Sequence, residues 1–192
     1  MSNRDDTGVK RVTVQNWVEP DEACVIWRQM TSIAKTEDQW AEFFLEPTLL
    51  PQVPVEIARL LEVARSAMMQ SWYYYPLATL GMEQCFRLME TGVRLRCEAL
   101  GISTKTITKN GRAIDTTFKD NIESLQLQNV ISEKHLTRWQ AIRFLRNASS
   151  HPKVRSIVDP GQAQGTLLLL VETLNEIFPD CGKTNPNHKA KA

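Results

Sequence analysis

Apolar residues recur at three- and four-residue steps from Val55 to Phe178, and this spacing decides the fold class. It is the pattern of a buried stripe along an amphipathic helix. The first predicted helix opens next to Pro54, which suits a first helical position because its missing N–H would lack a partner inside the helix. The buried stripe of this helix comprises Ile57, Leu60, Leu61, Ala64, Met68 and Trp72.

Four further helices are predicted along the chain. The second runs from about Pro76 to Leu100 and stops at Gly101, the residue type that favours helix C-termini. A short third helix is expected over 118–125. The fourth runs from an N-cap at Ser132 to about Ser150, and the fifth opens at Asp159-Pro160, a cap followed by a first-turn proline.

These helices divide the chain into three parts. Residues 54–178 are predicted to form an all-α fold, an antiparallel bundle of about five helices. Residues 179–192 have no apolar period, so we expect a disordered tail. The polar segment ISTKTITKNGRAIDTT connects the second and third helices and carries a turn signal at Asn110-Gly111.

Residues 1–53 differ from the bundle and are predicted to be an extension of mixed short elements. VTVQNWV and ACVIW are β-branched and aromatic runs, which are typical of strands. EDQWAEFFLE fits a helix of two turns, and PTLLPQVP closes the segment with its prolines.

The sequence predicts a cytoplasmic protein that needs no membrane. No apolar run approaches the ~20 residues that cross a bilayer, and MSNRDDTGVK lacks the apolar core of a secretory signal. The four cysteines form no C-x-x-C pair, which argues against a zinc ribbon or a dithiol redox centre. Buried or free thiols are expected at Cys24, Cys85, Cys97 and Cys181.

Charge is distributed unevenly along a chain whose net charge is only +1. The segment from Lys134 to Val158 has no acidic residue, and a local excess of basic side chains favours an anion-binding surface unless acids elsewhere in the fold neutralise it. Its basic residues are Lys134, Arg138, Arg143, Arg146, Lys153 and Arg155.

Within this segment the fourth helix ends in RNASSHP, and the proline changes the direction in which the histidine side chain can point. Arg146 and His151 are five residues apart, about 140° around a regular helix, so they would not face one another if the helix continued. Pro152 pushes the preceding residues out of helical geometry and lets His151 swing toward Arg146. A titratable histidine, a permanent cation and the amide of Asn147 form a minimal set for phosphodiester chemistry that requires no metal.

This motif, on a late helix of an all-helical domain, resembles the HEPN superfamily (higher eukaryotes and prokaryotes nucleotide-binding). Its signature is an arginine, four to six residues and a histidine, often with asparagine after the arginine. The order of the other segments is also similar to that of bacterial HEPN-like proteins, so the resemblance covers roughly 54–178. The matching segments are RLME (87–90), NIESL (121–125), RNASSHP (146–152) and TLLLLVETLNEIF (166–178).

The resemblance implies a metal-independent endoribonuclease without a cofactor, in which the motifs of two subunits of a homodimer meet in a basic cleft. By this resemblance His151 would be the general base, Arg146 the transition-state cation and Asn147 the positioning residue. Glu83 and Glu90, seven apart on one face of the second helix, are alternative candidates for an acid that orients the site. The residues expected to bind RNA are Arg138, Arg143, Lys153 and Arg155.

Other interpretations of the same residues stay open. Many HEPN-like proteins act as toxins or in phage defence, with an antitoxin or nucleotidyltransferase partner, whereas others are non-catalytic modules that bind RNA, nucleotide or protein. A histidine at a helix end also interacts favourably with the helix dipole without any chemistry. The aromatic run from Trp72 to Tyr75 fits packing better than stacking on bases, because no basic residue interleaves with it.

Overall fold

The computed structural model describes residues 9–150 and 157–179, except for the side chain of Ser150. Within this part, the chain forms seven α-helices, one short 3-10 helix and one two-stranded antiparallel sheet. The structure therefore confirms the predicted all-α class. In the described ranges, no helix combines the length and the apolar character needed to span a membrane.

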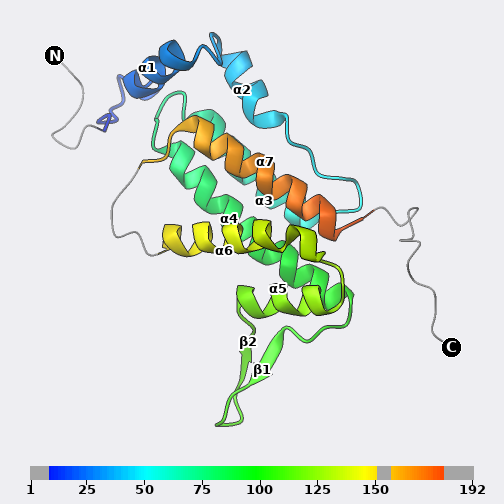
Figure 1. Ribbon diagram of the computed structural model, residues 1–192. Coiled ribbons are helices and arrows are strands. Elements are labelled where there is room, and N and C mark those ends of the chain that lie inside the picture. Colours follow the sequence, from blue (N-terminus) through cyan, green and yellow to red (C-terminus); the bar gives the residue numbers. More distant parts are fainter. Residues whose placement is uncertain (1–8, 151–156, 180–192) are drawn as a thin grey trace.

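The centre of the fold is the antiparallel pair α3 (Val55–Gln70) and α4 (Leu77–Ala99), with α7 (Pro160–Ile177) packed along α4 (Figure 1). Pro54 lies one residue before α3, as its N-cap. Gly81 allows α3 and α4 to approach closely, because a Cβ atom there would lie 2.8 Å from the carbonyl oxygen of Ala64. Gly101 follows the end of α4 with a φ of 70°, as the sequence predicts.

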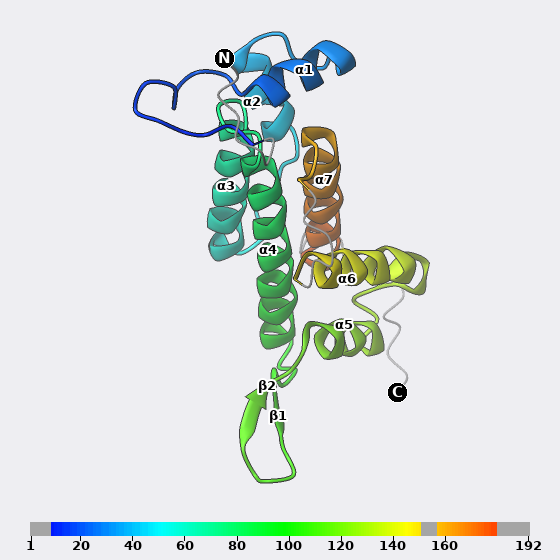
Figure 2. The same ribbon diagram turned by 90° about the vertical axis from the view of Figure 1, so that its left-hand side faces the viewer.

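Two helices lie crosswise to the lower half of α4, as Figure 2 shows: α5 (Phe118–Leu127) and α6 (Leu136–Ser150). A 3-10 turn, η1 (Glu133–His135), precedes α6, so Ser132 caps this turn and the α-helix starts four residues later than its predicted cap. The predicted cap of α7 is confirmed, because the Asp159 side chain accepts hydrogen bonds from the backbone of its first turn.

The strand prediction for the N-terminal extension is wrong. ACVIW lies inside α1 (Glu22–Thr31), whose N-cap Asp21 accepts a hydrogen bond from the Ala23 backbone N–H at 2.9 Å. VTVQNWV forms turns rather than a strand. The predicted helix over EDQWAEFFLE is confirmed as α2 (Glu37–Leu45).

The extension shares one hydrophobic core with the bundle. Trp40 of α2 is only 1% exposed, and its ring packs edge-on against Trp27 and Trp72. The indole N–H of Trp40 donates to the carbonyl of Met69 at the end of α3, at 3.1 Å. Trp72 is buried and covered by the guanidinium of Arg28, so the packing interpretation of this tryptophan is confirmed.

The polar connection between α4 and α5 forms a β-hairpin. β1 (Lys105–Ile107) pairs with β2 (Ala113–Asp115), and the predicted turn at Asn110-Gly111 joins them, with a φ of 77° at Gly111. Nearly all of the predicted tail, from residue 180 on, lies outside the described residues.

Three of the four predicted thiols are described, and all three are buried and free: Cys24, Cys85 and Cys97. Burial raises their pKa values from 9.0 to about 11, 12 and 11, respectively.

In a Cys181→Ser background, we expect these thiols to react slowly with a disulfide reagent at pH 8 and to react completely in urea. Fast reaction of all three in the native protein would contradict their burial.

The same pKa shifts predict an alkaline loss of stability. The unfolded chain releases its thiol protons near pH 9.0, whereas the folded chain retains them to about pH 11. The stabilisation is therefore complete below pH 9.0, and it declines as the pH rises through this interval.

Candidate functional site

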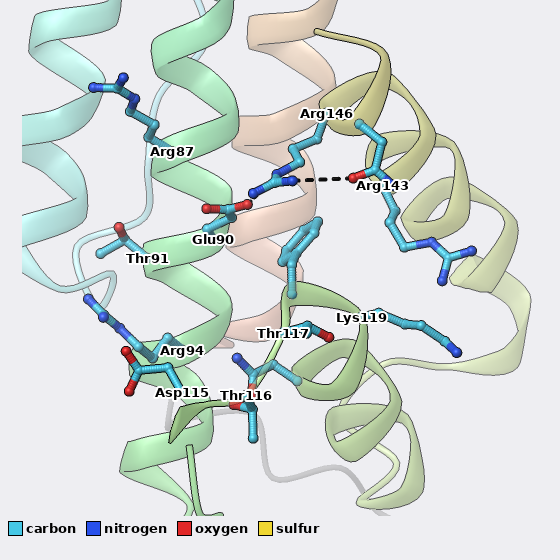
Figure 3. A pocket seen from close by; sticks show the side chains of 13 residues that line it. Arg87, Glu90, Thr91, Arg94, Asp115, Thr116, Thr117, Lys119, Arg143 and Arg146 are labelled. Carbon is cyan, nitrogen blue, oxygen red and sulfur yellow. Dashed lines mark hydrogen bonds and ion pairs between the residues drawn. The ribbon is translucent and has the colours of Figure 1, made fainter. Parts of the chain in front are cut away.

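A cleft of about 650 Å³ lies beside α4, where the end of β2, the start of α5 and the last turns of α6 meet. Figure 3 shows its side chains, with those of α4 on one side and those of α6 on the other. A volume of this size accommodates a ligand of nucleotide size, larger than a single phosphate. The lining residues are Arg87, Glu90, Thr91, Arg94, Asp115, Thr116, Thr117, Phe118, Lys119, Asn121, Arg143, Arg146 and Asn147.

Among the described residues, the lining of the cleft is strongly cationic, with five basic and two acidic side chains. Lys119 pairs along its own helix with Glu123, at 3.5 Å. Arg87, Arg94 and Arg143 form no ion pair with any residue that the structure describes. A recess with unpaired charges of one sign concentrates its field on ligands of the opposite sign. The cleft is therefore suited to an anionic ligand.

Arg146 points from α6 across the cleft to α4 (Figure 3). Its Nε donates to Oε1 of Glu90 in an ion pair, and its Nη1 donates to Oδ1 of Asn147 at 3.3 Å. The side chains of Arg146 and Glu90 remain 34% and 35% exposed, so a ligand can still reach the guanidinium. The structure thus brings together three of the predicted site residues and holds the arginine in one orientation.

Glu83 and Glu90 occupy different positions relative to Arg146. Glu83 lines a second, smaller hollow of about 250 Å³, on the other side of the Arg146–Glu90 pair. Ser149 lines this hollow as well. Of the two alternatives for an orienting acid, Glu90 is the one that forms an ion pair with Arg146 within the described residues.

Arg138 lies away from the cleft lining, in a cluster that joins α6 to α7. Glu176 of α7 accepts a hydrogen bond from the ring of His135 at 2.5 Å, and its second oxygen lies 3.8 Å from Arg138. Glu176 therefore partly neutralises the N-terminal end of the basic segment. For this end, neutralisation by an acid from elsewhere in the fold applies rather than a free anion-binding surface.

His151, Lys153 and Arg155 fall in 151–156, outside the described residues. Of the predicted site residues, Arg143, Arg146 and Asn147 line the cleft together with Glu90. No group of three or more His, Cys, Asp or Glu side chains is arranged to hold a metal ion in the ranges 9–149 and 157–179.

Comparison with known proteins assigns the region that carries the cleft to a protein family. Residues 83–188, more than half of the chain, match the family described as Domain of unknown function (DUF4145). The chain belongs to the DUF4145 family. No curated protein and no solved structure matches it.

The DUF4145 region contains every residue that lines the cleft, and it begins within α4, after α1, α2 and α3. Two of its cations, Arg87 and Arg94, were not predicted as site residues. A detectable signal exists, because Glu90 and Thr91 lie three and four residues after Arg87 and four and three residues before Arg94. The four residues therefore form a polar stripe opposite the buried face of α4. This stripe forms the α4 side of the DUF4145 cleft.

Proposed function

We propose that this protein is a metal-independent endoribonuclease of the HEPN type, active as a homodimer. The observation that carries the proposal is the position of Arg146: the arginine of the RNASSHP motif lies in a cationic cleft and is oriented by Glu90. The order of helices around the cleft supports a HEPN-like bundle, because the Glu90 helix, the short α5, the motif helix and the apolar α7 follow in that sequence.

In the proposed reaction, His151 takes the proton from a ribose 2′-hydroxyl, and the freed oxygen attacks the adjacent phosphorus. The bond to the 5′-oxygen breaks, this oxygen takes up a proton, and a 2′,3′-cyclic phosphate remains. Arg146 stabilises the extra negative charge on the phosphorane, a contribution commonly worth ~3 to 4 kcal/mol. Asn147 and Glu90 position its guanidinium. Arg143, Arg87 and Arg94 bind neighbouring phosphates, with Lys153 and Arg155 as the other RNA-binding candidates.

The homodimer is proposed because one motif supplies only half of a composite site. On the described part of α6, Phe144 is 70% exposed and Leu145 is 39% exposed, on the same helix as Arg146. Exposed apolar side chains next to a functional residue favour an interface at that place. A role as a toxin or phage-defence effector, with an antitoxin or nucleotidyltransferase partner, belongs to the same proposal.

The direct test is RNA cleavage by the purified protein in the presence of EDTA. We expect products with 2′,3′-cyclic phosphate and 5′-hydroxyl ends. His151→Ala should abolish cleavage, whereas His188→Ala, a matched change in the C-terminal tail, should leave it unchanged. Cleavage retained in His151→Ala would sink the assignment.

A second function is supported by the pairing of Arg146 with Glu90. The ion pair neutralises part of the charge of Arg146, while Arg87, Arg94 and Arg143, which pair with no acid among the described residues, remain available for binding phosphate without chemistry. A non-catalytic module that binds RNA, nucleotide or an acidic partner would show binding without turnover. In that case Arg146→Ala would weaken the affinity, and His151→Ala would change nothing.

A further inference from the structure

The β1–β2 hairpin carries three basic side chains that the cleft does not include. Lys105, Lys109 and Arg112 occur within eight residues, and Lys109 and Arg112 flank the turn at the tip. All three are exposed, and none forms an ion pair with a described residue. The hairpin contains one acid, Asp115, which lies at its base opposite Lys105. The tip is therefore purely cationic.

The hairpin projects away from the helices. In Figures 1 and 2, which are turned by 90° from one another, it extends beyond the end of α4 and no helix covers it. Every residue of both strands is exposed. An isolated two-stranded hairpin is only marginally stable in water and buries nothing here, so core packing does not account for it.

The base of the hairpin is held firmly against α5. The Thr116 backbone N–H donates to the Thr104 carbonyl at 2.9 Å, and its hydroxyl donates to Oδ1 of the buried Asn121 at 2.6 Å. Thr117 and Asp120 then form a capping box at the start of α5. The hydrogen bonds from Thr117 lower the pKa of Asp120, so this carboxylate is ionised at neutral pH. The direction of the hairpin is thus set by the fold.

The hairpin is continuous with the cleft. Asp115, Thr116 and Thr117, where β2 ends and α5 begins, are part of the cleft lining. β2 covers only Ala113–Asp115, so from Thr116 to Arg112 the extended chain spans at most about 13 Å, at roughly 3.3 Å per residue. An extended anion that leaves the cleft on this side passes Lys105 and its cross-strand neighbour Asp115 at the base, and then reaches Lys109 and Arg112 at the tip.

We infer that the β1–β2 hairpin is an arm that binds the phosphate backbone of single-stranded RNA whose reacting phosphate lies in the cleft. This inference rests on the proposed function. The arm holds the strand without reading bases, because it offers cations and no aromatic side chain for stacking. Its exposed Ile107 and Ile114 lie on opposite faces, as their register requires, so neither face is a continuous apolar surface for a protein partner.

The test uses the full chain with His151→Ala, so that RNA binding is measured without cleavage. The arm variant carries Lys105→Ser, Lys109→Ser and Arg112→Ser. The matched control carries Arg11→Ser, Lys35→Ser and Arg59→Ser, three exposed cations outside the cleft lining. Fluorescence anisotropy compares oligouridylates of about 4 and about 20 nucleotides over a series of salt concentrations.

We expect the arm variant to bind the long strand at least about tenfold more weakly at low salt. The slope of log K against log salt concentration should also be smaller in magnitude by about 2, because each of the three lost phosphate contacts contributes ~0.7. Its binding of the short strand should equal that of the control variant. If the parent binds the long strand and the arm variant binds it with the same affinity and the same salt slope, the inference that the hairpin binds RNA is overturned. A change in molecular mass by light scattering, with RNA binding unchanged, would identify a protein contact instead and also overturn it.

The proposed nuclease can fail separately. If the chain with native His151 binds RNA but does not cleave it in EDTA, the nuclease proposal fails while the arm's effect on affinity stands. If the parent binds neither oligonucleotide, both proposals are overturned.

Discussion

For the proposed ribonuclease, we expect the replacement of Arg146 with alanine to lower kcat for RNA cleavage by about 10²- to 10³-fold. Its guanidinium is the only cleft cation fixed by partners at two of its nitrogens within the described residues, Glu90 and Asn147. A charge fixed in this way needs no reorganisation when the phosphorane forms, so its loss acts on kcat more than on KM. Single-turnover cleavage of a defined RNA, with circular dichroism to verify folding, measures the effect.

Two companion variants separate the charge from its geometry. Arg143→Ala removes a neighbouring cleft cation and should raise KM with little change in kcat. Arg146→Lys retains a positive charge but loses the planar guanidinium, so an intermediate kcat is expected. If Arg146→Ala changes only KM, the arginine is a binding residue and the non-catalytic module becomes the better description.

The same experiment distinguishes Glu90 from Glu83. Glu90→Gln should lower kcat because it weakens the ion pair that orients Arg146, and Glu83→Gln, seven residues earlier on α4, should not. In the Arg146→Ala background the effect of Glu90→Gln should disappear, since contacting residues are coupled. Equal effects in both backgrounds would show that Glu90 acts by another route.

The periodicity of the sequence predicts the bundle well, because one face of each helix must be buried. The C-terminal end of α4 and the cap of α7 follow from local residue types, Gly101 and Asp159, whose preferences do not depend on tertiary structure. ACVIW was misassigned for the opposite reason. Cys24 is the one fully buried residue of this segment. The β-branched and aromatic residues of ACVIW favour a strand only by local propensity, and the Asp21 cap and the contact of Cys24 with the core override that propensity.

The sequence predicts the motif residues of α6 and Glu90 of α4, but it does not predict which other side chains of α4 join them. Arg146 and Asn147 belong to a short motif, whereas Arg87 and Arg94 join the cleft only because α6 crosses α4 near Glu90. Arg138 shows the reverse case, since it lies in the same basic segment but pairs with Glu176 of α7. Crossing angles between helices decide such pairings, and the linear sequence does not specify them.

The N-terminal extension is expected to be as important for stability as any part of the bundle. Trp40→Ala should lower the free energy of unfolding by about 3–5 kcal/mol. The change removes a side chain that is 1% exposed and contacts the rings of Trp27, Phe44 and Trp72. The total free energy of unfolding of a globular domain is only ~5–15 kcal/mol, so the variant should unfold at a much lower urea concentration.

Trp17→Ala is the matched control, because Trp17 is 61% exposed and lies in the same extension. It should change the stability by no more than about 0.5 kcal/mol. Trp40→Phe keeps most of the ring contacts but loses the hydrogen bond from the indole to Met69, so it should fall between the two and remain folded. Equal urea midpoints for Trp40→Ala and Trp17→Ala would mean that the extension does not stabilise the bundle. The predicted order instead requires that the described part of the extension, from residue 9 on, contributes to the core that it shares with α4. For the proposed ribonuclease, Trp40→Ala should therefore also reduce RNA cleavage at elevated temperature.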